Sequence, residues 1–142
     1  MASFKVEGFN ELALSFDKLA NIPTNVIAEM LNAEADVIVR AQKATAKAML
    51  NGKFSTGKTA DSISKAKAIV QPNGGNIITV YAMGTRTRGK KSKTRNSEIA
   101  FVNEYGARGK PKRPFIAEAN KKHADEAVAA ATAVYDKYLG SI

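Results

Sequence analysis

The chain has 142 residues, which suits one domain with a single modest core and is too short for two. It contains no cysteine and one histidine, which excludes a disulfide framework, a thiolate metal site and a cysteine nucleophile. The N-terminus lacks a secretory signal pattern and no run of roughly 18 apolar residues occurs, so we expect a soluble protein that is neither exported nor inserted in a membrane.

The net charge of +9 is concentrated in one part of the chain. The interval 86–113 contains ten basic residues against two acidic ones, Glu98 and Glu104. The basic residues are Arg86, Arg88, Lys90, Lys91, Lys93, Arg95, Arg108, Lys110, Lys112 and Arg113. The remainder of the chain is therefore close to neutral.

The first fifty residues predict a strand and two helices. Phe4 and Val6 alternate with polar neighbours, as in a short strand. Apolar residues then recur at three- and four-residue steps across 9–19, which predicts a helix of roughly three turns. Pro23 can occupy the first turn of the next helix, whose apolar period continues to about Leu50.

The middle of the chain predicts a turn of helix and an antiparallel hairpin. Asn51-Gly52 ends the long helix, and a polar stretch with a short helical turn around 60–63 follows. The runs 66–70 and 77–83 have strand character and flank the turn residues of 72–75. We therefore expect these two runs to pair.

Residues 84–97 include no apolar side chain, so we expect a basic extended loop that is solvated or bound to a partner. The run 99–102 is expected to return to the core, and Pro114 to begin a final helix that ends near Leu139. The expected fold is α+β, a single domain over 1–142 in which a small antiparallel β-sheet packs against the long N-terminal-half helix and the C-terminal helix. Because much of the apolar fraction is alanine, we expect a thin core that neighbouring subunits help to stabilise.

The segment from Gly52 to Thr59 matches the phosphate-binding loop pattern G-x-x-x-x-G-K-[ST] in every letter. Such a loop needs a buried strand before it, whereas the segment before Gly52 has a helical period. No apolar run after the motif ends in a magnesium-binding acid before Glu104, and too few residues follow for a parallel nucleotide-binding sheet. We expect a helix end and a polar loop here, without bound nucleotide.

The sequence contains no set of residues that indicates a catalytic site. His123 lies near Asp125 and Glu126 on the predicted last helix, but we expect helical spacing to turn both carboxylates away from its face. Serine and threonine need a positioned base before they act as nucleophiles, and no candidate base accompanies them. We therefore expect no enzyme activity, no cofactor, no metal site and no small-molecule substrate.

Three interpretations of the basic loop remain open: a solvated surface, a nucleic-acid contact, or an assembly arm that docks on an acidic neighbour. The absence of aromatic residues from 84–97 disfavours single-strand recognition by stacking. The candidate residues for assembly or DNA contact are Arg86, Arg88, Lys90, Lys91, Lys93 and Arg95.

Several short motifs follow one another in a distinctive order. They are Phe9-Asn10-Glu11-Leu12, Thr56-Gly57, Ser62-Ile63, Tyr81-Ala82, Ile99-Ala100-Phe101-Val102-Asn103-Glu104-Tyr105-Gly106 and Arg113-Pro114-Phe115-Ile116. With these motifs, nearly the whole chain resembles the small tail-component and head-tail joining proteins (neck or tail-completion proteins) of long-tailed bacteriophages. Two features depart from that pattern: Ala107 stands where such proteins often have threonine, and the basic loop is longer.

The resemblance implies a structural role for seven residues: Phe101, Glu104, Tyr105, Gly106, Arg113, Pro114 and Phe115. Gly106 and the prolines suit a fixed turn. The rings of Phe101, Tyr105 and Phe115 are large enough to anchor the last helix on the sheet, so we expect all three to be packed there.

The resemblance also implies the biological setting. Proteins of this kind form a ring, with a hexamer favoured, between the portal-connector layers and the tail tube. The expected partners are further copies of the chain, neighbouring connector and tail proteins, and DNA in the channel. We expect a virion protein of the neck or tail that is made in the bacterial host cytoplasm. The alternative is a basic module that contacts DNA phosphates without sequence specificity, which the sequence pI of about 9.8 favours. A phosphate-loop enzyme is the least favoured of the three.

Overall fold

The computed structural model describes residues 4–6, 22–52, 55–71, 75–88 and 92–141. In chain order its elements are β1 (Phe4–Val6), α1 (Thr24–Met49), α2 (Lys58–Ser62), β2 (Ile63–Lys65), β3 (Asn76–Ile78), β4 (Val80–Ala82), β5 (Thr85–Arg88), β6 (Ser92–Arg95), α3 (Asn96–Tyr105) and α4 (Phe115–Gly140).

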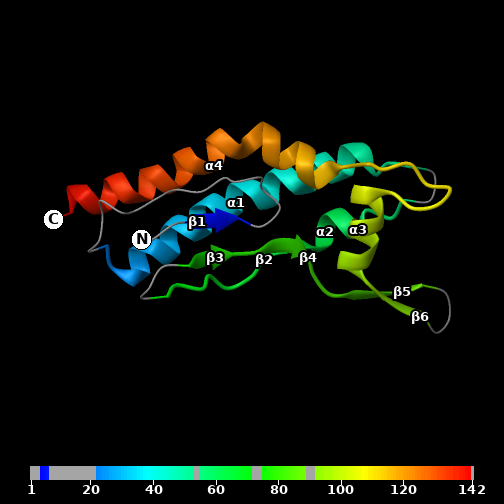
Figure 1. Cartoon of the computed structure of the whole chain (residues 1–142), viewed down its shortest axis with the longest axis horizontal. Coiled ribbons are helices and arrows are strands. Elements are labelled where there is room, and N and C mark those ends of the chain that lie inside the picture. The colour runs from blue at the N-terminus through cyan, green and yellow to red at the C-terminus, as the bar shows by residue number, and fades with distance from the viewer. Residues whose placement is uncertain (1–3, 7–21, 53–54, 72–74, 89–91, 142) are drawn as a thin grey trace.

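Two long antiparallel helices, α1 and α4, form the body of the molecule (Figure 1). α1 lies between α4 on one side and the strands β2, β3 and β4 on the other (Figure 1). This central position requires apolar side chains around much of α1, which agrees with its many buried residues. They include Val26, Ile27, Met30, Leu31, Ala35, Val37, Ile38 and Ala41.

The face of α4 that packs on α1 is built mainly from small residues. Ala119, Ala127 and Ala131 are buried on it, while Phe115 at its first position is the one large side chain among the fully buried residues of this helix. A polar contact also joins the helices, because the Gln42 amide donates to Asn120 Oδ1 at 2.9 Å. Alanine contributes little buried area, so most of the apolar core comes from α1, the strands and Phe115.

Within the described residues, the strands form three two-stranded sheets. β2 pairs antiparallel with β4, with Ile63 opposite Ala82, and an isolated bridge joins Ile69 to Ile77. β5 pairs antiparallel with β6, whereas β1 pairs parallel with β3. Buried residues of β2, β3 and β4 cover the face of α1 opposite α4: Ile63, Ile78, Val80 and Ala82.

The α+β fold with two long helices is confirmed, and both helices lie within a residue of their predicted bounds. The antiparallel hairpin is confirmed, although its main pairing begins at Ile63 rather than at residue 66. The parallel β1–β3 pair was not predicted, because alternation identifies a strand without identifying its partner. The helix predicted over 9–19 lies outside the described residues.

The segment 84–97, which we expected to be a basic extended loop, has regular secondary structure in its described part. Within this interval the chain forms the β5–β6 hairpin and then enters α3 at Asn96. The Asn96 amide donates to the Gly84 carbonyl at 2.9 Å and closes the base of the hairpin. Paired strands satisfy each other's backbone groups without an apolar core, and the threonines of this segment favour extended backbone.

Candidate interaction surface

Arg86 attaches the β5–β6 hairpin to the rest of the domain. Its Nε donates to Asn96 Oδ1 at 2.9 Å, and its terminal nitrogens donate to the hydroxyls of Thr56 and Thr59. The side-chain Nδ2 of Asn96 in turn donates to the Met83 carbonyl at 2.8 Å. Arg86 therefore has a structural role within its own chain, whereas the sequence predicted a segment that is solvated or bound to a partner.

The other candidate basic residues occupy different positions. Lys93 and Arg95 are exposed on β6, and their register partners on β5 are Thr87 and Thr85. Arg88 is the last residue of β5, while Lys90 and Lys91 lie outside the described residues. Of the six candidates, Lys93 and Arg95 are the two whose side chains are described and exposed.

Two aromatic rings are exposed on α3. Phe101 is 61% exposed and Tyr105 is 68% exposed, and their ring centroids lie 4.7 Å apart. We call these two residues the aromatic pair. The prediction that they anchor the last helix is wrong, because the short helix α3 turns Ala100 and Glu104 inward instead. The side chain of Phe115 is fully buried in the core, as expected for a packed ring, but the helix that it begins packs mainly on α1 rather than on the strands.

Glu104 joins α3 to α4. Its Oε2 accepts from the Ile116 amide at 2.8 Å, and its Oε1 accepts from the Ala117 amide at 2.9 Å. These amides belong to the first turn of α4, where backbone donors have no partner within the helix. The buried carboxylate thus caps α4 from a different element and opposes the positive end of its dipole.

The connection between α3 and α4 is fixed by backbone contacts. The Arg113 amide donates to the Asn103 carbonyl at 2.6 Å, and Pro114 occupies the position before the first residue of α4. Gly106 has φ of 78°, and a Cβ placed there would lie 3.1 Å from the Lys110 carbonyl oxygen. The predicted fixed turn is therefore confirmed, and it holds the aromatic pair at a set position relative to α4.

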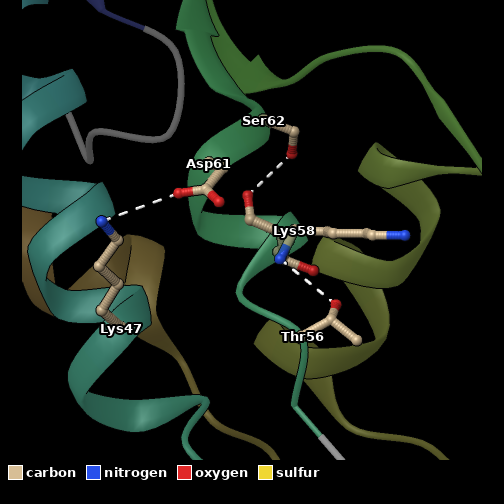
Figure 2. Close-up of polar contacts among 6 residues, drawn as sticks. Lys47, Thr56, Lys58, Asp61 and Ser62 are labelled. Carbon is tan, nitrogen blue, oxygen red and sulfur yellow. Dashed lines mark hydrogen bonds and ion pairs between the residues drawn. The ribbon is translucent and has the colours of Figure 1, made fainter.

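The segment that matches a phosphate-binding loop follows helix α1 and leads into α2, which has five residues. The expected absence of a strand before it is confirmed in this part of the chain. Figure 2 shows that Lys58 and Asp61 point to opposite sides of α2, with Asp61 directed at Lys47 on α1. The Lys47 Nζ and Asp61 Oδ1 atoms lie 3.7 Å apart.

His123 pairs with a neighbour on α4. Its Nδ1 lies 2.9 Å from Glu126 Oε2, so the expectation that both nearby acids turn away is wrong. The i, i+3 spacing brings these two side chains to adjacent positions on the helix surface. Within the described ranges, no three histidine, aspartate or glutamate side chains gather as a metal site. No helix in the same ranges is long and apolar enough to cross a membrane.

Sequence reasoning missed one buried acid, Glu34 on α1. Its side chain is buried and neither carboxylate oxygen has a hydrogen-bond partner. Burial raises the pKa of this carboxyl to about 7. Its position in the sequence could have predicted this burial, because residue 34 lies on the same helical face as the apolar residues Met30, Leu31 and Ile38.

No protein-family model, no curated protein and no solved structure matched the chain.

Proposed function

We propose that this chain is a non-enzymatic structural protein of a tailed-phage particle, a subunit of a ring in the neck or upper tail that joins the head connector to the tail. The observation that carries the proposal is the exposed aromatic pair on α3. Aromatic and arginine side chains are enriched in the contact regions of protein interfaces. Here two aromatic rings lie in contact with each other and open to solvent on an element that is tied to α4 by Glu104.

The surroundings of the aromatic pair support an assembly role. Arg108, Lys110 and Lys112 are exposed in the segment that follows α3, and Lys93 and Arg95 are exposed on β6. Exposed basic residues on the segments that precede and follow α3 favour an acidic partner surface, since complementary charge sets orientation and association rate. In a ring, repetition of the same modest contact multiplies its effect on the stability of the whole assembly. The motif order over 99–116 supports the family assignment.

Complementation of a phage that lacks the gene tests this function. The variant changes Phe101 and Tyr105 together to alanine, and we expect free heads and free tails in electron micrographs instead of joined particles. Both side chains are exposed, so the purified variant should keep the wild-type melting temperature. The matched control is Tyr81→Ala, which removes an aromatic side chain that is 43% exposed on β4, and it should restore joined particles.

Two outcomes would contradict the proposal at different levels. Joined particles at normal yield with the double variant would show that the aromatic pair is not a required contact. Absence of the protein from purified wild-type particles would reject the virion role itself. The mass of the protein in complex with purified connectors would give the number of copies in the ring.

A further inference from the structure

A cavity of about 480 Å³ lies where the end of α1, the segment before α2, β5 and α3 meet. Four of its lining residues are cationic and come from different parts of the chain, whereas the described lining includes no aspartate or glutamate. The cations are Lys47, Lys58, Arg86 and Arg113. Hydroxyl and amide groups complete the polar lining, namely Ser55, Thr56, Thr59, Thr87 and Asn103. This set of donors matches an anionic ligand.

The cationic side chains are positioned by the fold. Hydrogen bonds to the side chains of Thr56, Thr59 and Asn96 hold the Arg86 guanidinium in place. Arg113 reaches back toward the segment that follows α1, where its Nη1 would lie 3.9 Å from a Cβ on Gly52.

Lys47 and Lys58 differ in how they lie relative to Asp61. Asp61 is directed at Lys47, while Lys58 points to the other side of α2 (Figure 2). Lys58 therefore points away from the Lys47–Asp61 ion pair, and it lines the cavity together with Arg86 and Arg113. Like charges held at one site raise the local positive potential, and a bound anion relieves their repulsion.

A second, more open cavity of about 460 Å³ adjoins the first and shares Lys58, Arg86 and Thr87 with it. Its other lining residues are Asp61, Ser62, Thr85 and Asn96, so its described lining contains one acid. It lies at the base of the β5–β6 hairpin, whose strand β6 exposes Lys93 and Arg95. A single phosphate ion would occupy one of these cavities. A polymer with one phosphate in every nucleotide can extend past Lys58 and Arg86, which line both cavities, toward the exposed Lys93 and Arg95, so this spread of cations favours a polymer.

We propose that this cavity binds a phosphate group of a nucleic-acid backbone, with Lys58 and Arg113 as the contacting cations and Arg86 as the side chain that bridges the two cavities. Such contacts are charge-assisted and independent of base sequence. The inference concerns the single chain and does not depend on ring formation, so DNA binding can be tested apart from the virion role.

Fluorescence anisotropy with labelled DNA tests the proposal. The probe is a duplex of about 20 base pairs in two unrelated sequences, titrated with wild-type protein at NaCl concentrations from about 50 to 200 mM. Each phosphate contact contributes about 0.9 to the slope of log K against log salt. We expect equal affinity for both sequences, and for Lys58→Ala with Arg113→Ala a slope reduced by about 1.8 and a Kd raised by roughly tenfold or more at low salt.

The control variant removes the same charge elsewhere: Lys121→Ala with Lys137→Ala, both exposed on α4. It should keep the wild-type slope. Since Lys58 and Arg113 are also exposed, both double variants should keep the wild-type melting temperature. If the cavity variant nevertheless unfolds, the single change Lys58→Gln should lower the slope by about 0.9.

Three outcomes would overturn the proposal. Undetectable duplex binding by the wild type at low salt would show that nucleic acid is not the ligand of this cavity. Equal changes in slope for the two double variants would show that binding follows net charge and not this cavity. Displacement of the duplex by millimolar inorganic phosphate, at matched ionic strength, would assign the cavity to the free anion.

Discussion

Glu34 places a carboxyl group in the apolar interior. It lies on the α1 face that carries Met30, Leu31 and Ile38, and its two oxygens have no hydrogen-bond partner. An ionised carboxylate there would lose its hydration without compensation, so the protonated form is favoured. Burial accordingly raises the pKa of Glu34 from 4.5 to about 7.

This shift makes stability depend on pH in a direction opposite to that of a salt-bridged acid. Below pH 4.5 the group is protonated in both folded and unfolded states, and its contribution is fully present. Between pH 4.5 and about 7 the unfolded state loses the proton first, so stability falls by on the order of 3 kcal/mol as pH rises. Urea denaturation of the wild type and Glu34→Gln at several pH values should show this fall in the wild type alone.

The control for Glu34 is Glu29→Gln, an exposed position on the same helix. It should retain the wild-type dependence on pH through this range. If Glu34→Gln and the wild type lose stability in parallel from pH 4.5 to 7, then the interior carboxyl is not the group that titrates.

Gly106 is a position where only glycine fits. Its φ of 78° and ψ of 173° belong to a region that side chains exclude, and a Cβ would approach the Lys112 nitrogen to 3.1 Å. We expect Gly106→Ala to lower the free energy of unfolding by about 1 to 3 kcal/mol in chemical denaturation. Gly109→Ala is the comparison, because Gly109 also has positive φ but no atom within 4 Å of the added Cβ. Equal losses at the two positions would mean that the close backbone approach at Gly106 has no energetic effect.

At the scale of elements, the junction of α3 and α4 depends on one carboxylate. Glu104 accepts from two amides in the first turn of α4, and charged hydrogen bonds of this type stabilise by about 1.5 to 3 kcal/mol each when buried. We expect Glu104→Ala to cost about 2 to 4 kcal/mol in urea denaturation, and Glu104→Gln to cost less because one acceptor oxygen remains. Glu98→Ala, at an exposed position on α3, should cost under about 1 kcal/mol. A cost for Glu104→Ala as small as that of Glu98→Ala would refute the capping role.

The long elements could be predicted from the sequence because their signal is local. The apolar period of α1 and α4 extends over many turns, so one or two irregular positions do not obscure it. The orientation of α3 could not be predicted in the same way. Its ten residues include apolar side chains on more than one face, and the choice to bury Ala100 and expose Phe101 depends on how the helix meets α2 and α4.

The candidate sites likewise include features that the sequence could predict and features that it could not. The concentration of basic residues in 86–113 was visible in the sequence. The cavity lined by Lys58, Arg86 and Arg113 was not, because these residues are far apart in the chain and are brought together by the fold. In the sequence, Lys58 is distinguished only by its place in the phosphate-binding-loop pattern, and the strand that normally precedes such a loop is absent here. The cap at Glu104 likewise depends on contact with amides twelve and thirteen residues later.

The molecule as a whole has one basic end. The β5–β6 hairpin and α3 lie at the opposite end from the C-terminal turn of α4 (Figure 1). The interval 86–113, which carries most of the net charge, belongs to these elements and to the segment that follows them. A charge distribution of this kind orients the molecule as it approaches an acidic partner, and the effect weakens as salt screens it.

The pairing of α1 with α4 also constrains when the protein can fold. α1 is synthesised early, but the helix that covers one of its two apolar faces follows every other element in the chain. Contacts between segments so distant in sequence form only after the intervening chain has been ordered or looped out. During translation, one apolar face of α1 therefore stays uncovered until α4 has left the ribosome. The domain can complete its folding only after that point.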